Sequence, residues 1–503
     1  MAKRTAIIDI GLNSISLVIY EKSSRYAFHL IEKVRAKVRI GEGAYENDGN
    51  LLELAMDRAY DALEDFLSVS KSLGCKKVLS VATSALRDAP NKKVFLKRVS
   101  SGLSLNIKII DGQKEAYFGA VAALNLLPKI KNATTIDIGG GSTELAKIED
   151  GKIVDTISLN IGTVRLKELF FDKKKEYLLV QSFIDDILSK LPETFKSTNI
   201  IGIGGTIRAL SDAVLKDSNY PIDSLHAFEY FYDEHKNFIE KVAKSEVLKL
   251  KDTSISRSRY DTIREGSAIF YMLCQKLEAQ TIITSKAGVR EGVYLSDILR
   301  NCNHVFPHNF NISIKSLIDR FALYGKNITQ VQKTTTAIYE QTNYIFDKDE
   351  KYKDILSVSS KLLLITRRLN IYSNSDMSFS FLVENLNFAL SHKDKILIAI
   401  ILKYSHKKDI NEKEIAKFSE LLPSVETIKW LSFILSLTVC INKNKKPQKT
   451  SITFDENELC VISDSKMFLT SECIKKLKKP ASFAIVLKSL SSSSNGPISS
   501  HWA

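Results

Sequence analysis

The chain carries one strand–turn–strand pattern twice, and this repeat limits what it can fold into. The stretch "TTIDIGGGSTELAKIED" covers residues 134–150, and a thinner copy, "AIIDIGLNSISLVIYEK", covers residues 6–22. Aligned without gaps, the copies share turn residues as well as strand residues: Asp9 with Asp137, Gly11 with Gly139, and Ser14 with Ser142. Chance easily matches apolar strand residues, but matching turn residues indicate two related structural units.

Strand-like and helix-like runs around each copy predict an α/β fold. From the N-terminus they predict three strands, a helix over 50–74, and then strand, short helix, strand and helix up to residue 127. A similar series restarts at Thr134 and continues to about residue 300. The order βββαβαβα is that of a ribonuclease H-like domain, and two such domains in tandem form the actin-like architecture, with phosphate bound between them. We predict actin-like domain I over 1–128 and actin-like domain II over 129–302.

The remaining two-fifths of the chain has a different pattern of hydrophobic residues. Long helical periodicities predict a helical domain over 303–442, and two strand-like runs predict a small α/β region over 443–503. The apolar run at 430–441 is shorter than the roughly 20 residues that a membrane crossing needs, so it predicts a buried helix. The first residues pass directly into a strand-like run without a signal-peptide pattern. We therefore expect a cytoplasmic protein with no membrane partner.

Composition narrows the class of partner. The chain has 503 residues, of which 44% are hydrophobic and 26% charged, as is typical of folded globular proteins. The net charge is +14, and residues 301–503 hold 28 basic and 19 acidic side chains. Such an excess attracts polyanions, although it can also serve solubility alone. The six cysteines include no CxxC pair, so we expect six free thiols and no zinc site.

Three glycine-containing loops follow predicted strands and could bind phosphate through backbone N–H groups. The first loop offers Gly11, Asn13 and Ser14. The second loop offers three glycines and two hydroxyl groups: Gly139, Gly140, Gly141, Ser142 and Thr143. The third loop offers Gly204, Gly205 and Thr206 where a helix begins, and a helix N-terminus favours anions. A glycine loop by itself can equally be a simple hairpin turn.

Charged residues near these loops suggest the remaining chemistry. Asp9, Asp137 and Glu144 are hard oxygen donors that suit Mg²⁺. Glu115 begins a helix directly after a strand and could orient a water molecule, although the helix dipole also favours a glutamate there. Arg87 and Arg259 could neutralise phosphate charge, although each alone is more typical of a surface salt bridge.

Six motifs occur in the order found in one enzyme family. They are "DIGLNSISL", "VATSALRDAPN", "GQKEA", "DIGGGSTEL", "IGIGGTIRAL" and "SKAGVREG". From residue 1 to about residue 300 the chain resembles the exopolyphosphatase and guanosine pentaphosphate phosphohydrolase family. The resemblance implies Mg²⁺-dependent removal of a terminal phosphate and a homodimer. It also implies a catalytic role for Glu115, metal binding by Asp137 and Glu144, and phosphate binding by the three loops, Arg87 and Arg259.

The chain departs from the family pattern at two places. In the first loop, Leu12 replaces a serine and Ser16 stands where many members have an arginine, so the substrate preference or the rate could differ. The helical region resembles the family's third domain, which is related to His-Asp metal phosphohydrolases. It is degenerate here, because Arg367 and Arg368 stand where relatives have a histidine, and no His-Asp pair occurs in the chain. We expect His392 and His406 to be surface residues.

Three functions are compatible with these residues. The first is a hydrolase that releases phosphate from inorganic polyphosphate, converts guanosine pentaphosphate to tetraphosphate, or does both. The second is an actin-type ATPase or kinase, and the third is a non-catalytic sensor of guanosine tetra- or pentaphosphate. Leu12 favours the sensor, whereas the retained Glu115 favours hydrolysis. We expect no stable nucleic acid partner.

Overall fold

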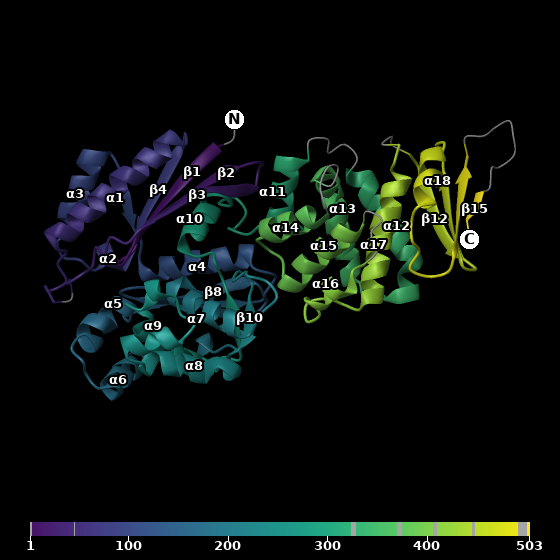
Figure 1. Cartoon of the computed structure of the whole chain (residues 1–503). Coiled ribbons are helices and arrows are strands. Elements are labelled where there is room, and N and C mark those ends of the chain that lie inside the picture. The colour runs from purple at the N-terminus through teal and green to yellow at the C-terminus, as the bar shows by residue number, and fades with distance from the viewer. Residues whose placement is uncertain are drawn as a thin grey trace. The chain divides into compact units, whose positions relative to one another are not determined.

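The computed structural model describes residues 3–44, 46–322, 328–369, 375–405, 410–444, 448–490 and 500–502. The chain divides into two compact units, Met1–Ile312 (unit 1) and Ser313–Ala503 (unit 2). Unit 1 has a mixed α/β fold, and unit 2 consists of helices followed by a small sheet (Figure 1). The finer division of the chain into four domains stays a prediction.

The first sheet of unit 1 has five strands in the order β3-β2-β1-β4-β5. These strands are β1 (Lys3–Ile10), β2 (Ile15–Lys22), β3 (Phe28–Ala36), β4 (Lys77–Ala82) and β5 (Ile107–Ile109). The first three form an antiparallel meander, and β4 and β5 continue the sheet in parallel with β1. The connecting helices are α1 (Glu53–Ser72), α2 (Ser84–Arg87), α3 (Lys92–Leu103) and α4 (Gly112–Leu126). This is the predicted order of elements.

The second sheet has six strands in the order β10-β11-β9-β6-β7-β8. They are β6 (Ala133–Ile138), β7 (Thr143–Glu149), β8 (Lys152–Leu159), β9 (Asn199–Ile203), β10 (Glu229–Phe231) and β11 (Thr281–Thr284). The helices of this half are α5 (Thr163–Leu166), α6 (Tyr177–Leu188), α7 (Gly204–Asp217), α8 (Tyr232–Lys244), α9 (Ile263–Lys276) and α10 (Val289–Ile298). Read from β8 to β11, the strand order repeats that of the first sheet, so the repeat in the sequence is also a repeat in topology.

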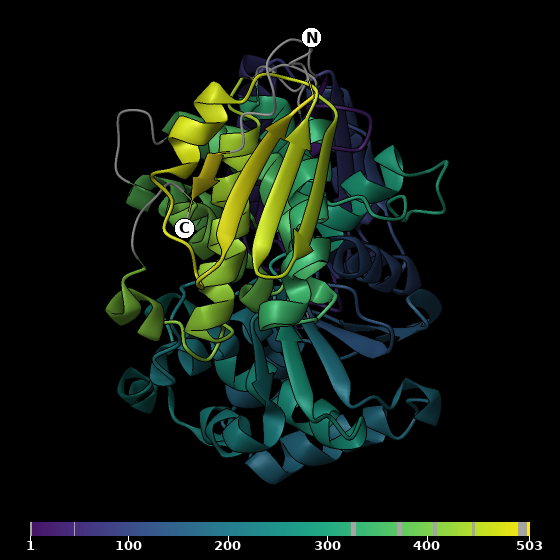
Figure 2. The ribbon, with the colours of Figure 1, turned by 90° about the vertical axis from the view of Figure 1, so that its right-hand side faces the viewer.

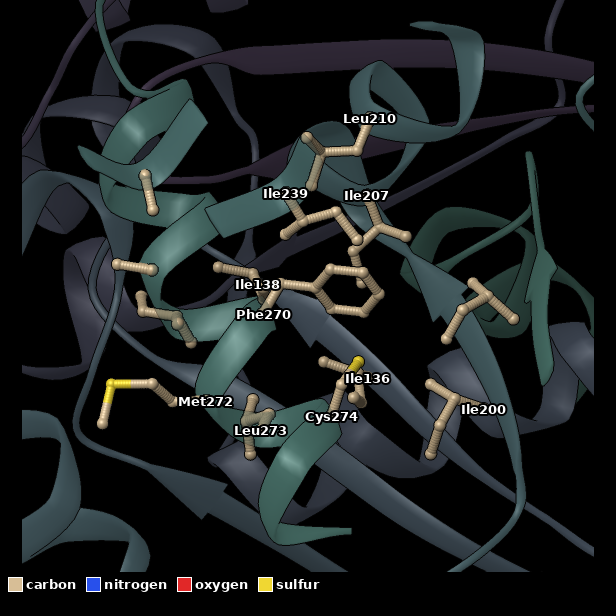
Figure 3. Close-up of a cluster of buried hydrophobic side chains, with 14 of the residues drawn as sticks. Ile136, Ile138, Ile200, Ile207, Leu210, Ile239, Phe270, Met272, Leu273 and Cys274 are labelled. Atoms are coloured by element: carbon tan, nitrogen blue, oxygen red, sulfur yellow. The ribbon is translucent and has the colours of Figure 1, made fainter. Parts of the chain in front are cut away.

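Branched side chains supply the core of the second half. Figure 3 shows Phe270 of α9 surrounded by Ile136 and Ile138 of β6, Ile207 of α7 and Ile239 of α8. All of these side chains are buried. Such packing fixes β6 relative to α7 and α9, and so fixes the position of the loop that leaves β6 at residue 139.

Helices α4 and α10 are exchanged between the halves of unit 1. The two helices pack against each other, α4 lies on β6, β7 and β8 of the second sheet, and α10 lies on β1 of the first. Asp111 caps α4, because its side chain accepts a hydrogen bond from the Lys114 N–H. The first turn of α4, which carries Glu115, is thereby held against the sheet that carries the second loop.

Unit 2 begins with the predicted helices. They are α11 (Ile312–Phe321), α12 (Ile328–Phe346), α13 (Lys351–Leu369), α14 (Ser375–Asn385), α15 (His392–Tyr404), α16 (Glu412–Ala416) and α17 (Val425–Ile441). The apolar run at 430–441 lies in α17, and nearly all of it is buried. No helix in the described part of the chain is long and apolar enough to cross a membrane.

Two predictions about histidines in unit 2 have different outcomes. His392 is buried, so the prediction of a surface residue is wrong. The reason is that α15 is buried continuously from Lys395 to Tyr404, and His392 lies on the buried side of its first turn, whereas Lys393 is exposed. His406 lies outside the described residues, as do the side chains of Arg367 and Arg368.

A four-stranded sheet completes unit 2, and Figure 2 shows its strands β12-β13-β14-β15. They are β12 (Thr450–Asp455), β13 (Glu458–Ser463), β14 (Ala484–Ser489) and β15 (Ser500–Trp502), and α18 (Phe468–Ile474) follows β13. A disulfide joins Cys440 of α17 to Cys473 of α18. The expectation of six free thiols is therefore wrong. These cysteines are 33 residues apart in the sequence, and only the packing of α18 on α17 brings them together.

The disulfide predicts a thiol count. Of the six cysteines, Cys75, Cys274, Cys302 and Cys460 are free. We expect four reactive thiols in protein that is denatured without reductant and six after reduction, as measured with a chromogenic thiol reagent. Six thiols in both samples would contradict the pairing.

Glu265 predicts a pH dependence of stability. Burial raises the pKa of this side chain from 4.5 to about 7, and Arg264 only partly offsets the effect. Between pH 4.5 and 7 the folded state holds a proton that the unfolded state has lost, so the free energy of unfolding falls as pH rises. We expect Glu265→Gln to stabilise the protein by about 3 kcal/mol at pH 8 and by little at pH 4.

Urea unfolding at both pH values measures this difference. The matched control is Glu149→Gln, because Glu149 is an exposed glutamate at the end of β7. A gain in Glu265→Gln that is the same at both pH values would contradict the assignment.

Candidate active site

The first and second loops form the same turn in the two halves of unit 1. The Gly11 N–H donates to the Ser14 carbonyl oxygen over 3.2 Å, and the Gly139 N–H donates to the Ser142 carbonyl oxygen over 2.9 Å. Across each hairpin, Asp9 pairs with Ser16 and Asp137 pairs with Glu144. The second copy therefore has a carboxylate where the first has a hydroxyl group, so two of the three predicted metal ligands lie in the second half.

The two loops touch through Leu12. This side chain is 6% exposed, and a Cβ atom built on Gly140 would lie 2.8 Å from the Leu12 Cβ. Leu12 also packs against Gly41. The departure from the family pattern at this position therefore adds an apolar contact between the loops. The backbone of the first loop stays ordered, because Gly41 and Arg39 donate to the carbonyl oxygens of Leu12 and Asn13.

Arg87 joins three of the predicted site residues. Its Nη1 donates to the Glu115 Oε2 over 3.0 Å, and its Nη2 donates to the Ser142 Oγ over 3.0 Å. The Glu144 Oε1 lies 4.0 Å from the same Nη2 and accepts a hydrogen bond from the Ser158 Oγ over 2.8 Å. Side chains from α2, α4, the second loop and β7 thus meet at one point.

The carboxyl groups at this point hold protons unusually tightly. Burial and the neighbouring Glu144 raise the pKa of Glu115 well above its ordinary value, although Arg87 opposes the shift. Burial likewise raises the pKa of Glu144 to about 7 and of Asp9 to about 6, and it raises that of Asp137. Asp137 repels Asp9, Glu115 and Glu144, so added positive charge would stabilise the ionised forms.

These oxygen donors fit a hard divalent cation. In the described residues, no group of three or more His, Cys, Asp or Glu side chains could hold a metal ion by itself. Mg²⁺ usually takes only one or two protein carboxylates and completes its octahedron with water and substrate phosphate. Asp137, Asp9 and Glu144 therefore suit Mg²⁺ as an open site that a phosphate completes, and their assignment as metal ligands stays a prediction.

The third loop lies against Asp137. β9 runs parallel to β6, so Asp137 pairs with Ile203, the residue before Gly204. Gly204 has a φ of +86°, and a Cβ atom there would collide with the Asp137 Oδ1. A Cβ atom on Gly205 would lie 2.6 Å from the Arg259 Nη1, so Arg259 lies against the third loop, and its predicted phosphate contact stays a prediction.

Two threonines of the predicted loops are buried. Thr143 is fully buried, and its Oγ1 donates to the Ile161 carbonyl oxygen over 2.7 Å. This bond ties β7 to the segment that braces the second loop, and the predicted phosphate contact of Thr143 stays a prediction. Thr206 is 7% exposed and packs against Gly266 of α9.

The motifs did not single out several charged residues near the loops. The Arg35 Nε donates to the Ser14 Oγ over 3.1 Å, and Arg35 pairs with Ser16 across β2 and β3. This places an arginine beside the position where the sequence lacks one. Arg290 and Arg208 interact electrostatically with Asp137. The signal for Arg35 was the alternation of basic residues in "EKVRAKVRI", and Arg290 lies within the motif "SKAGVREG".

The part of the chain that carries this site is similar to known proteins. A model of the Ppx/GppA phosphatase family matches residues 18–301. The chain belongs to the Ppx/GppA phosphatase family. Within the Ppx/GppA match lie Arg87, Glu115, the second and third loops, and Arg259, whereas the first loop at 11–14 precedes it.

Several Ppx/GppA relatives are similar over longer or shorter stretches. The chain is 29% identical over 314 residues to a bifunctional 3-dehydroquinate synthase/phosphatase of Fusobacterium nucleatum, which covers 58% of this chain but only 46% of that protein. It is 27% identical over 355 residues to a guanosine-5'-triphosphate,3'-diphosphate pyrophosphatase of Pseudoalteromonas translucida, which covers 67% of each. A protein of the same name from Photobacterium profundum is 22% identical and covers 79% of each.

Solved Ppx/GppA structures resemble the fold. The Aquifex aeolicus family member has a TM-score of 0.51 and 28% identity, and it covers 60% of this chain and 99% of that one. An exopolyphosphatase from Cytophaga hutchinsonii has a TM-score of 0.54 and 23% identity, with 59% and 98% coverage. At 23% identity, the likeness to the Cytophaga hutchinsonii structure supports the fold alone.

The surroundings of Gly204 predict that adding a methyl group there lowers the free energy of unfolding. Gly204→Ala places a side chain in the left-handed region and pushes on the Asp137 carboxylate. The matched control is Gly74→Ala, because Gly74 has a φ of +66° with nothing within 4 Å of a built Cβ. We expect the control to lose about 1–2 kcal/mol and Gly204→Ala to lose clearly more, as measured by urea unfolding. Equal losses would contradict the contact with Asp137.

Proposed function

We propose that the chain hydrolyses a terminal phosphoanhydride bond and releases orthophosphate. Its substrate would be inorganic polyphosphate, guanosine pentaphosphate, which it would convert to tetraphosphate, or both. The observation that carries the proposal is the contact of Arg87 with both Glu115 and Ser142. This contact puts a buried carboxylate beside a loop whose N–H groups can receive a phosphoryl group. The names of the pyrophosphatase and exopolyphosphatase relatives support the same chemistry.

In this proposal Glu115 orients and deprotonates the attacking water. Arg87 binds only its Oε2, so Oε1 can accept a hydrogen bond from water. Burial raises its pKa, which makes the carboxylate a stronger base once a nearby positive charge keeps it ionised. Arg87 also stands beside the second loop, where it can stabilise charge that develops on the transferred phosphoryl group.

Asp137, Asp9 and Glu144 would hold Mg²⁺ in the proposed reaction. A bound Mg²⁺ would neutralise phosphate charge and lower the cost of ionising the four buried carboxyl groups. Ser158 supports this role, because its hydroxyl group fixes the Glu144 Oε1. Arg259, over the third loop, would bind phosphate oxygens from the other side.

We also propose a finer assignment of the fold in both units of the chain. The shared order of strands, β3-β2-β1-β4-β5 and β8-β7-β6-β9-β11, supports two tandem ribonuclease H-like, actin-like domains. We infer that the helices of unit 2 derive from an HD-type domain. A homodimer is also proposed from the family resemblance, and light scattering of the purified protein tests it.

Two other functions make different predictions. An actin-type kinase needs an acceptor, so phosphate release without an acceptor separates it from a hydrolase. A non-catalytic sensor would bind guanosine tetra- or pentaphosphate without turnover. Leu12 was the residue that favoured the sensor. In the fold it fills the contact with Gly140 and leaves the Arg87–Glu115 pair intact, which favours hydrolysis.

A phosphate-release assay tests the proposed function. Purified protein with Mg²⁺ is given long polyphosphate and, in parallel, guanosine pentaphosphate. We expect turnover of at least one substrate, and we expect Glu115→Gln to lower kcat by about 10²–10⁴-fold, because the amide cannot accept the proton from water.

Glu149→Gln is the control for the amide substitution and should retain the parent rate. Full activity of Glu115→Gln would exclude Glu115 as the base. Absence of phosphate release from both substrates would reject the proposed function and leave the sensor.

A further inference from the structure

A cavity of about 300 Å³ lies in unit 2, between α17 and the segment that follows α18. We call it the unit 2 cavity, because every residue that lines it belongs to unit 2. Its volume is at the small end of the range of ligand pockets. Half of its lining is apolar or aromatic, and the other half is polar, with no acidic side chain among the described residues. The polar half consists of Lys429, Ser432, Ser436, Lys478 and Lys479.

The segment that forms one wall of the unit 2 cavity is anchored to α17 on both sides. Before the wall, the Cys440–Cys473 disulfide joins α17 to α18, and the backbone hydrogen bonds of α18 continue to Leu477, where the wall begins. After the wall, Phe483 stacks on Trp430 of α17 with ring centroids 5.7 Å apart. The two walls are therefore held at a fixed spacing, so a ligand need not order them.

Ser432 contributes a hydroxyl group that has no partner. The residue is 4% exposed, and within the part of the chain that the structure describes its Oγ makes no hydrogen bond. Ser436 lies one turn later on the same face of α17, and its Oγ donates to the Ser432 carbonyl oxygen over 2.8 Å. A buried hydroxyl group without a partner is costly. A ligand oxygen in the unit 2 cavity would remove this cost.

The three lysines give the lining an excess of positive charge. The Lys429 Nζ lies 3.4 Å from the Oε1 of Glu412, which does not line the cavity. The Lys479 Nζ donates to the Phe483 carbonyl oxygen over 2.6 Å, and this neutral partner leaves the charge of the ammonium group in place. Lysine binds phosphate as a point charge, whereas planar carboxylates are matched better by arginine. The lining therefore suits a phosphate group.

We propose that the unit 2 cavity binds a phosphate monoester with a small apolar body. The lysines and the Ser432 hydroxyl group hold the phosphate oxygens, and the apolar side chains, among them Phe433 and Leu477, contact the body. A bare phosphate ion would use only the polar half of the lining. The site goes beyond the proposed function, because it uses none of the three loops and requires no hydrolysis.

Titration calorimetry with phenyl phosphate tests the unit 2 cavity. This probe joins a phosphate group to a small apolar ring, and it has no phosphoanhydride bond for the proposed hydrolysis to consume. The full chain is used without reductant, so that the disulfide persists. Parent protein is compared with Ser432→Ala and Lys478→Ala. Orthophosphate, phenol and long polyphosphate are titrated in parallel.

Each substitution has a matched control in the same unit. For Ser432→Ala it is Ser359→Ala, because Ser359 is a fully buried serine of α13 whose Oγ donates to the Ile355 carbonyl oxygen over 2.8 Å. For Lys478→Ala it is Lys466→Ala, because both lysines are exposed but Lys466 does not line the unit 2 cavity.

We expect Ser432→Ala to raise the Kd for phenyl phosphate by about tenfold to a hundredfold, because a hydrogen bond to a charged group is lost. Lys478→Ala should raise it by about twofold to fivefold. Both controls should keep the parent Kd. Orthophosphate should bind more weakly than phenyl phosphate, and phenol should show no binding that depends on Ser432.

Unfolding in urea without ligand separates a binding role of Ser432 from a structural one. Ser432→Ala should unfold at the same urea concentration as the parent or at a higher one, because the folded protein loses no hydrogen bond. Ser359→Ala should unfold at a lower concentration. An equal loss of stability in the two variants would show that the Ser432 hydroxyl group serves the fold, and would overturn the site.

Three binding results would also overturn the proposal. The first is a Kd for phenyl phosphate that Ser432→Ala leaves unchanged. The second is orthophosphate that binds as tightly as phenyl phosphate, which would reject the ester. The third is a larger effect of Ser432→Ala on long polyphosphate than on phenyl phosphate, which would assign the unit 2 cavity to the polymer.

Discussion

The contacts of Arg87 hold the candidate site together. A guanidinium group has five donors in a fixed plane, so one arginine can bind a carboxylate and a hydroxyl group from different elements at once. Here it binds Glu115 on one side and Ser142 on the other, and Glu144 lies next to it. Without this cation, the buried carboxylates of Glu115 and Glu144 would repel each other, and this repulsion would oppose the close approach of α4 to β7.

The exchange of α4 and α10 between the sheets explains how such a contact can form. A helix that packs on the sheet of its own half would carry Glu115 away from the second loop. Because α4 instead packs on β6, β7 and β8, its first turn meets the hairpin that carries Ser142 and Glu144. The arrangement depends on tertiary packing, and the hydrophobic periodicity of α4 or of α10 alone does not predict it.

Much of the fold was predictable from the sequence because its signals are local. The strands beside Asp9 and Asp137 alternate or run apolar, the loops contain glycine where the chain turns, and α17 is an unbroken apolar stretch. The repeat also predicted that the two hairpins would share a turn, which the bonds from Gly11 and Gly139 confirm. The features that were missed depend on distant residues. They are the Cys440–Cys473 disulfide, the burial of His392, the use of the Thr143 hydroxyl by Ile161, and the position of Arg35 beside Ser16.

Leu12 has a consequence for motion between the two hairpins. A serine in this loop could exchange its neighbours for water at little cost when the hairpins part. A leucine that is 6% exposed cannot, because separation would return its apolar surface to water at a cost of about 1.5–3 kcal/mol. Leu12 therefore favours the spacing of the two loops in which its side chain contacts Gly140. A substrate that needs a wide opening must supply that free energy from its own binding, whereas a slender chain that threads past the loops need not.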